Sequence, residues 1–169
     1  MLPFKATALL PPGCTYRDRM VALISATRLF GELRPAEQEQ LSEYLEAWKV
    51  EAGETIFREG ELGRLLAVVV AGRVQIERTS DFGMIHPVAE LTTGMALGEM
   101  SLIDGNPRSA TARMAETGTL LVLHEKDFNR LVSERPALAY LIMKKLARSL
   151  SLKLRKTTGR LMDYLDVDF

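Results

Sequence analysis

The sequence predicts an α+β fold, in which an antiparallel barrel or sandwich of short strands lies between helices at both ends of the chain. Two observations support this prediction. Glycines recur between residues 53 and 105, and the runs between them are short and rich in Val, Ile, Leu and Thr, which is typical of short strands joined by turns. Outside that region, apolar residues recur at helical spacing.

Two helices are expected before the strands. Apolar residues at mostly helical spacing predict the first over residues 18–30. Pro35 suits the first turn of a second helix. Leu41, Leu45 and Trp48 follow at i, i+4 and i+7, so we assign them to the buried face of that second helix.

The expected strands are the apolar runs between the glycines. They cover residues 55–57, 65–70, 73–79, 85–91, 108–115 and 119–123. The run 65–70 is apolar throughout, as expected for a strand that is covered on both faces. After residue 123 the pattern becomes helical again, and it predicts a short helix over 125–132 and a longer one from 136 to about 158.

The composition bounds the class of protein. A chain of 169 residues suffices for one domain with a substantial core and an appended helix or two. Its 22 basic and 22 acidic residues balance, so net charge does not favour nucleic acid as a partner. The single cysteine, Cys14, suits a reducing compartment, and no apolar run approaches the about 18 residues of a membrane-spanning helix. We therefore expect a cytoplasmic protein without a membrane span.

No residue pattern in the sequence is typical of catalysis or metal binding. His86 and His124 have no Cys, His or Asp at metal-ligand spacing. The chain also lacks a Ser-His-Asp, paired-carboxylate or Walker-type pattern. We therefore expect a protein that is not an enzyme and that holds no metal.

Residues 98–112 combine groups that suit a sugar and a phosphate. Gly98 allows a close approach of the backbone, and a helix over 96–102 would begin with free amide groups that attract an anion. The Glu99 carboxylate can accept hydrogen bonds from sugar hydroxyls, and the Arg108 guanidinium can bind phosphate oxygens in bidentate fashion. The alternative is a surface helix and turn in which Glu99 and Arg108 form an ordinary salt bridge.

This stretch resembles the phosphate-binding cassette of cyclic nucleotide-binding domains. The Gly-Glu pair, the apolar run after it and the sequence Pro-Arg-Ser-Ala-Thr match the cassette in order and spacing. Residues 52–60 and 70–74 resemble two further signatures of the family's β-roll. The predicted helices also match the family in type and order, so the resemblance covers about residues 26–154.

The resemblance implies an antiparallel, jelly-roll-like double-stranded β-helix, flanked by N-terminal helices and a long C-terminal helix. The implied organisation is an arm over 1–17, N-terminal helices over 18–48, the roll over 49–124 and the closing helices over 125–169.

The resemblance also implies a cyclic nucleotide ligand, cAMP or cGMP. Glu99 would accept a hydrogen bond from the ribose 2′-hydroxyl, and Arg108 would pair with the cyclic phosphate. The expected ligand-binding residues are Leu97, Gly98, Glu99, Met100, Ser101, Arg108, Ser109, Ala110 and Thr111.

Recognition of the base is left open by the sequence. Positions that contact adenine in the family's transcription regulators fall at about Lys153 and Leu154, which carry no hydroxyl group. Thr111 is a candidate guanine contact by analogy with guanosine-preferring members, with a strand threonine that pairs across the sheet as the alternative. Met114, Val88 and Leu91 are expected in the core, with a wall of the base pocket as the alternative.

Basic residues line the C-terminal helix without an acidic residue among them. They are Arg135, Lys144, Lys145, Arg148, Lys153, Arg155, Lys156 and Arg160. We expect a solvated face on a helix whose apolar side contacts a second copy of the chain or a partner protein. The alternative is a surface for nucleic acid. We do not favour it, because the nineteen residues that follow Leu150 are too few for the helix-turn-helix of the family's transcription regulators.

These expectations combine into a sensor. A cyclic nucleotide would bind in the roll, and the C-terminal helices would move and change a contact with a partner. Two alternatives stay open: an interaction or scaffold subunit that keeps the roll but does not respond to a ligand, and a dimeric regulator that acts through the basic terminal helix.

Overall fold

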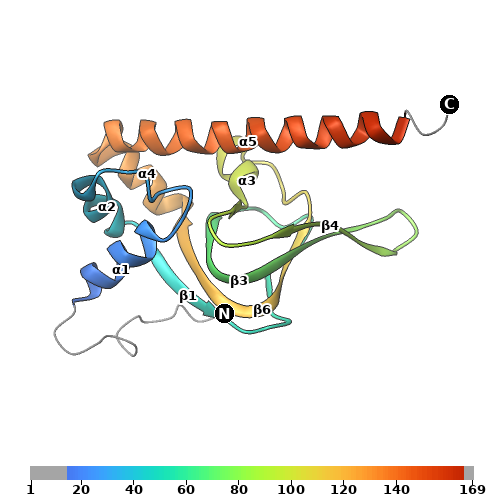
Figure 1. Ribbon diagram of the computed structural model, residues 1–169, viewed down its shortest axis with the longest axis horizontal. Coiled ribbons are helices and arrows are strands. Elements are labelled where there is room, and N and C mark those ends of the chain that lie inside the picture. Colours follow the sequence, from blue (N-terminus) through green and yellow to red (C-terminus); the bar gives the residue numbers. More distant parts are fainter. Residues whose placement is uncertain (1–14, 166–169) are drawn as a thin grey trace.

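The computed structural model describes residues 15–165, without the side chains of residue 160 and residues 163–165. Its elements, in chain order, are α1 (Tyr16–Ser25), α2 (Pro35–Ser42), β1 (Glu46–Val50), β2 (Thr55–Phe57), β3 (Leu65–Thr79), β4 (Ile85–Leu91), β5 (Ala96–Leu97), α3 (Glu99–Asp104), β6 (Thr111–His124), α4 (Glu125–Glu134) and α5 (Pro136–Leu165). The curved sheet lies below α5, and α1, α2 and α4 gather at one end of it (Figure 1). The α+β class and the antiparallel roll are confirmed, whereas the expected arm over 1–17 lies mostly outside the described residues.

Two long strands, β3 and β6, organise the sheet. They pair antiparallel from Leu65 opposite His124 to Glu77 opposite Thr111. The strands β1 and β2 pair with β6, while β4 and β5 pair with β3, and all four pairings are antiparallel. Each long strand joins two runs that the sequence pattern separates.

Glycines explain why β3 and β6 continue through the expected breaks. The register between the two strands shifts around Ala71 and Arg73. Gly72 lies between them with φ +85°, in the left-handed region that suits glycine. A side chain on Gly118 of β6 would collide with the Ala71 carbonyl. The glycines therefore bend a continuous ladder and do not end its strands.

The core consists of two hydrophobic clusters, one on each face of the sheet. Along β3, Leu66 and Val68 belong to the cluster that includes residues of the helices, whereas Ala67 and Val69 belong to the cluster inside the roll. This alternation places one strand between two apolar layers. The expectation that 65–70 is covered on both faces is therefore confirmed for the four buried positions.

The assignment of Leu45 and Trp48 to the second helix is wrong. Leu41 lies on α2 as expected and is fully buried, but α2 ends at Ser42. Trp48 lies in β1, opposite Leu120 of β6. Helical spacing at three positions is outweighed here by pairing with β6, because every residue of β1 has a partner on that strand.

The C-terminal helix α5 extends further than expected. Ile142 and Leu146 are fully buried in the helix-side cluster, whereas Leu154 is 67% exposed. The helix continues to Leu165, and its C-terminal end lies on the side of the β3–β4 hairpin, away from α1 and α2 (Figure 1). Among residues 15–165, no helix is both long and apolar enough to span a bilayer.

Candidate functional site

The candidate site is the segment 96–111, which we call the cassette. Ala96 and Leu97 form β5 and pair with Val68 and Ala67 of β3, so the expectation of a helix over 96–102 is wrong at its start. The helix α3 begins only at Glu99, after Gly98 has turned the chain with φ +78°. The β-pairing explains the difference, because it fixes the first two residues in an extended conformation.

Arg108 is buried at the base of the cassette. It is 5% exposed, and its guanidinium donates hydrogen bonds from Nη1 to the Gly98 carbonyl at 2.9 Å and from Nη2 to the Leu65 carbonyl at 2.8 Å. The Cζ atom lies 4.0 Å from the centre of the Phe57 ring. These contacts hold the guanidinium between β3, the start of α3 and β2.

The charge of Arg108 is not balanced by an ordinary ion pair. Within residues 15–165, no salt bridge joins its guanidinium to Glu99 or to another carboxylate. Burial lowers the pKa of Arg108, while the carboxylates of Glu61 and Glu99 act in the opposite direction, and a guanidinium stays protonated at neutral pH. The alternative of a simple Glu99–Arg108 surface salt bridge therefore does not describe this site.

Glu99 is the second buried charge of the cassette. It is 3% exposed, and its Oε1 accepts a hydrogen bond from Lys153 Nζ of α5 at 2.5 Å. The same Nζ donates to the Ala96 carbonyl at 2.8 Å. The sequence pattern did not place Lys153 in this contact. One feature of the sequence could have pointed to this lysine. Ile142, Leu146 and Leu150 form the apolar side of α5, and Lys153 interrupts that side one turn later. Lys153 is the residue that contacts the cassette.

The other expected site residues fall into two groups. Leu97, Ser101 and Ala110 are buried, whereas Met100 and Ser109 are exposed. Their contact with a ligand stays a prediction.

Two expectations about base recognition can be compared with the structure. The Thr111 hydroxyl oxygen accepts a hydrogen bond from the Glu59 backbone N–H at 3.0 Å, so this side chain has a structural partner. Met114 and Leu91 are buried inside the roll, in agreement with a core position. Val88 is 47% exposed and does not belong to that core.

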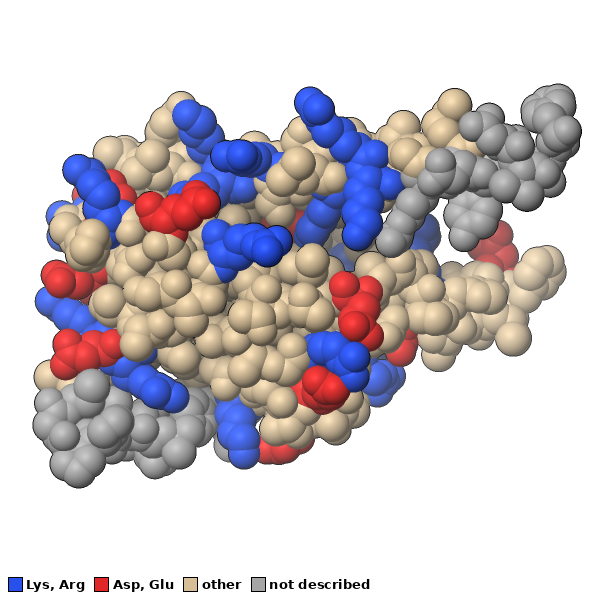
Figure 2. Space-filling model, viewed as in Figure 1, with Lys and Arg blue, Asp and Glu red and all other residues tan. Residues whose placement is uncertain are grey.

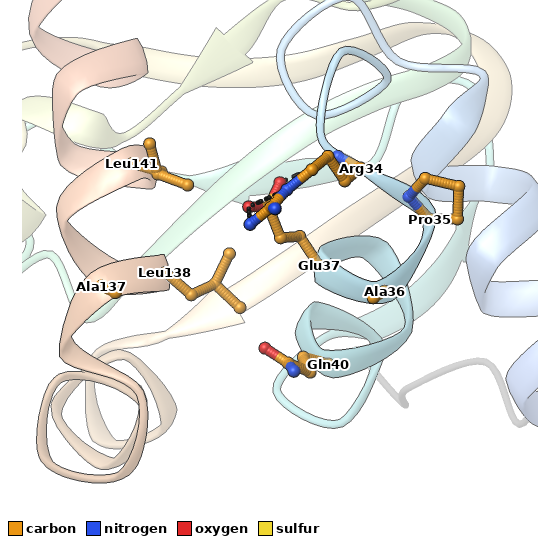
Figure 3. Close-up of a pocket in the computed structure, with 8 residues that line it drawn as sticks. All are labelled: Arg34, Pro35, Ala36, Glu37, Gln40, Ala137, Leu138 and Leu141. Atoms are coloured by element: carbon orange, nitrogen blue, oxygen red, sulfur yellow. Dashed lines mark hydrogen bonds and ion pairs between the residues drawn. The ribbon is translucent and has the colours of Figure 1, made fainter.

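An open groove of about 490 Å³ lies elsewhere, between α2 and the start of α5. Its lining residues are Arg34, Pro35, Ala36, Glu37, Gln40, Ala137, Leu138 and Leu141 (Figure 3). Arg34 and Glu37 pair with each other at 2.6 Å on the α2 side of the groove. The cassette residues do not line this groove, and among residues 15–165 no group of three or more His, Cys, Asp or Glu could hold a metal ion.

Comparison with known proteins identifies the family. The family model of the cyclic nucleotide-binding domain matches residues 47–135, more than half of the chain. The chain belongs to the cyclic nucleotide-binding domain family. The cassette lies inside the matched residues, and Lys153 lies outside them.

Curated members of the cyclic nucleotide-binding family include transcription regulators and channels. The chain is 36% identical over 122 residues to the cyclic AMP receptor protein of Thermus thermophilus, across 72% of this chain and 56% of that protein. It is 41% identical over 122 residues to a cyclic nucleotide-gated potassium channel of Mesorhizobium japonicum, across 72% of this chain and 32% of the channel. The chain thus spans about a third to just over half of the length of these relatives.

Solved structures of the family agree with the architecture. The catabolite activator protein of Thermus thermophilus superimposes with a TM-score of 0.69 at 35% identity, over 82% of this chain and 62% of that one. A cyclic nucleotide-binding domain from Methylobacillus flagellatus gives a TM-score of 0.77 at 24% identity, over 88% of this chain and 84% of that one. The second likeness supports the fold alone.

Proposed function

We propose that this chain is a regulatory module that binds a cyclic nucleotide, cAMP or cGMP, in the cassette and couples binding to movement of α5. The observation that carries the proposal is the buried guanidinium of Arg108, which has carbonyl and aromatic partners but no carboxylate at salt-bridge distance within residues 15–165. Such a group is stabilised by an anion, because an uncompensated buried charge is unfavourable. A cyclic phosphate supplies that anion.

The two buried charges suit the two halves of the ligand. The carbonyl bonds of Arg108 use two of the five N–H donors of a guanidinium, which leaves donors for phosphate oxygens. The Glu99 carboxylate accepts hydrogen bonds and suits a ribose hydroxyl. A fused sugar and phosphate presents both groups at a fixed separation, which a single short segment from Gly98 to Arg108 can match.

The output surface of the module is the exposed side of α5 from Leu152 onward. Leu152, Leu154, Leu161 and Met162 are exposed there, and Lys and Arg side chains gather along the same helix (Figure 2). We infer that this surface contacts a second copy of the chain or a partner protein. A ligand changes that contact only through its different affinity for the two positions of the helix.

Calorimetric titration of the purified chain with cAMP and cGMP tests the proposal. We expect saturable binding of at least one of them, and no binding of 5′-AMP, which lacks the cyclic phosphate. Arg108→Ala should lose about 2 kcal/mol of binding free energy, because it removes a charge-assisted pair. Arg17→Ala is the matched control, because Arg17 of α1 forms an exposed salt bridge with Glu43, the residue after α2. Equal affinities of Arg108→Ala and wild type would reject the role of Arg108.

A ligand-unresponsive interaction subunit is the second candidate. The observation that favours it is the Lys153–Glu99 pair, because Glu99 is already satisfied without a ligand. The same titration separates the candidates, since this subunit would bind neither cAMP nor cGMP at millimolar concentration.

A further inference from the structure

The exposed side of α5 carries basic charge that no neighbouring carboxylate balances. Residues 137–162 include seven Lys and Arg residues and no Asp or Glu, although the whole chain is formally neutral. Two of these lysines pair with carboxylates of other segments, Glu32 and Glu99. Four further basic residues are exposed and belong to no salt bridge within residues 15–165, and they are Lys144, Arg148, Arg155 and Lys156.

Three of these four residues lie on one side of the helix. Lys144, Arg148 and Arg155 follow one another at i, i+4 and i+11, which places them within about 40° around the helix axis. We call them the basic stripe. The fully buried Ile142 and Leu146 lie on the opposite side. Because α5 forms one boundary of the molecule, where Lys and Arg side chains gather, the basic stripe is directed away from the roll (Figures 1 and 2).

Exposed apolar side chains accompany the basic stripe. Tyr140, Leu152 and Met162 are 63%, 60% and 53% exposed, and each lies within about 60° of the centre of the stripe. From Tyr140 to Met162 the helix rises by about 33 Å. Basic and apolar groups therefore share one side of a rod, and a flat surface can contact them all at once.

We propose that this side of α5 binds the surface of an anionic lipid bilayer, with the helix parallel to the membrane plane. The basic stripe is attracted by anionic headgroups, while the side chains of Tyr140, Leu152 and Met162 enter the boundary between headgroups and acyl chains. A nucleic acid would use the same charges but would leave these apolar groups in water. The inference does not depend on whether the cassette binds a nucleotide.

The bilayer would leave part of the output surface free for a protein. Leu154 and Leu161 are exposed, and they lie about a third of a turn around the helix from the basic stripe. Leu152 and Met162 are thereby assigned to lipid, and Leu154 and Leu161 to a second copy of the chain or a partner protein. Both contacts can form on one helix at the same time.

Sedimentation of the purified chain with lipid vesicles tests the proposal. We expect binding to vesicles of phosphatidylcholine and phosphatidylserine in a ratio of about 7 to 3, and at least about tenfold weaker binding to phosphatidylcholine alone. Added NaCl should weaken the binding, because it screens the basic stripe from the headgroups. Absence of binding, or equal binding to both kinds of vesicle, would overturn the proposal.

A pair of double variants distinguishes the basic stripe from the net charge. Arg148→Gln with Arg155→Gln should weaken binding to the mixed vesicles by about 20- to 30-fold, since each basic residue near an anionic surface contributes about fivefold. Arg17→Gln with Arg78→Gln removes the same charge from side chains that are 57% and 62% exposed on α1 and β3. This control should stay within about twofold of wild type, and an equal loss would overturn the assignment to the stripe.

Apolar variants distinguish a bilayer from other polyanions. Met162→Ser should weaken binding to the mixed vesicles several-fold, because it removes an apolar group from the lipid boundary, whereas Leu154→Ser should not. The reverse order would place the bilayer on another side of α5 and overturn the proposal. Tighter binding to a short DNA duplex than to the vesicles, at the same salt concentration, would assign the stripe to nucleic acid and overturn it as well.

Discussion

The guanidinium of Arg108 lies over the ring of Phe57, with Cζ 4.0 Å from the ring centre. The phenylalanine belongs to β2 and the arginine to the cassette, so the roll itself positions the charge that we assign to the phosphate. Burial of Arg108 strengthens such a contact, because less water competes with the ring for the cation. The aromatic face and two carbonyls together accommodate a cation that has no carboxylate within ion-pair distance in the described part of the chain.

Replacement of Phe57 by leucine should weaken both the fold and the site. We expect Phe57→Leu to lower the free energy of unfolding by about 1 kcal/mol, because it removes a desolvated cation–π contact while it keeps an apolar side chain. The affinity for a cyclic nucleotide should fall several-fold, since Arg108 would be less well positioned. Urea denaturation and calorimetry measure the two effects. Phe82→Leu is the control, because Phe82 is 94% exposed, and a loss of equal size there would contradict the explanation.

Substitution of two glycines in the cassette distinguishes the effect of backbone strain from the effect of a collision with Arg108. Gly98 and Gly105 both have positive φ, +78° and +70°. A Cβ on Gly98 would lie 2.5 Å from Arg108 Nη1, whereas a Cβ on Gly105 would meet nothing within 4 Å. Gly98→Ala and Gly105→Ala should each lose about 1 kcal/mol of stability from the left-handed conformation. Gly98→Ala should lose more than this, because its Cβ would also lie 2.8 Å from the Leu65 carbonyl oxygen.

Only Gly98→Ala should also lose nucleotide binding, because the new methyl group would displace the guanidinium. Calorimetry on both variants, with urea denaturation as the stability control, measures the difference. If Gly105→Ala lost as much affinity as Gly98→Ala, strain alone would explain the effect and the assigned role of Gly98 would be wrong.

The roll was largely predictable from sequence because its signals are local. The strand ranges 55–57 and 85–91 match β2 and β4, since turn residues bound short apolar runs there. The helical spacing of Trp48 predicts the wrong element because its strand partner, Leu120, lies more than 70 residues away in β6. The breaks expected near residues 71 and 118 are absent because paired glycines allow β3 and β6 to bend as continuous strands.

The sequence predicts the two charged residues of the cassette but not the residues that contact them. Glu99 and Arg108 stand in one segment with a recognisable spacing, and the structure buries both. Their partners Phe57, Leu65 and Lys153 come from three other elements. Residue order does not reveal which side chain of α5 reaches Glu99. That contact depends on the position of the helix on the roll, which the packing of the buried Leu146 helps to fix.

The packing of α5 against the rest of the domain should depend on Leu146. This side chain is fully buried in the helix-side cluster, and Leu146→Ala should lower the free energy of unfolding by about 2–5 kcal/mol, since it removes buried methyl groups and leaves a cavity. Leu154→Ala, two turns along the same helix and 67% exposed, should change it by less than about 0.5 kcal/mol. Urea denaturation of both variants checks the pair. Similar losses would mean that Leu154 is covered in solution.

A buried phenol should make the stability of the chain depend on pH at the alkaline end. Tyr44, which follows α2, is buried, and its hydroxyl donates to Glu134 Oε2 of α4 at 2.5 Å. The hydrogen bond to Glu134, and then burial, raise the pKa of Tyr44 above its ordinary value of 10.0. A raised pKa in the folded state means that the unfolded chain loses this proton first. The contribution of Tyr44 to stability is therefore complete below about pH 10 and is lost as the pH rises through the folded value.

Tyr44→Phe isolates this contribution. The variant should be less stable than wild type at pH 8, because it leaves the Glu134 carboxylate without its donor. The difference should shrink as the pH rises above 10 and wild type loses the same interaction. Urea midpoints at a series of pH values measure it, with Tyr140→Phe on the exposed face of α5 as the control for loss of a phenol. A difference that stays constant across the whole series would show that the proton of Tyr44 is not what links α2 to α4.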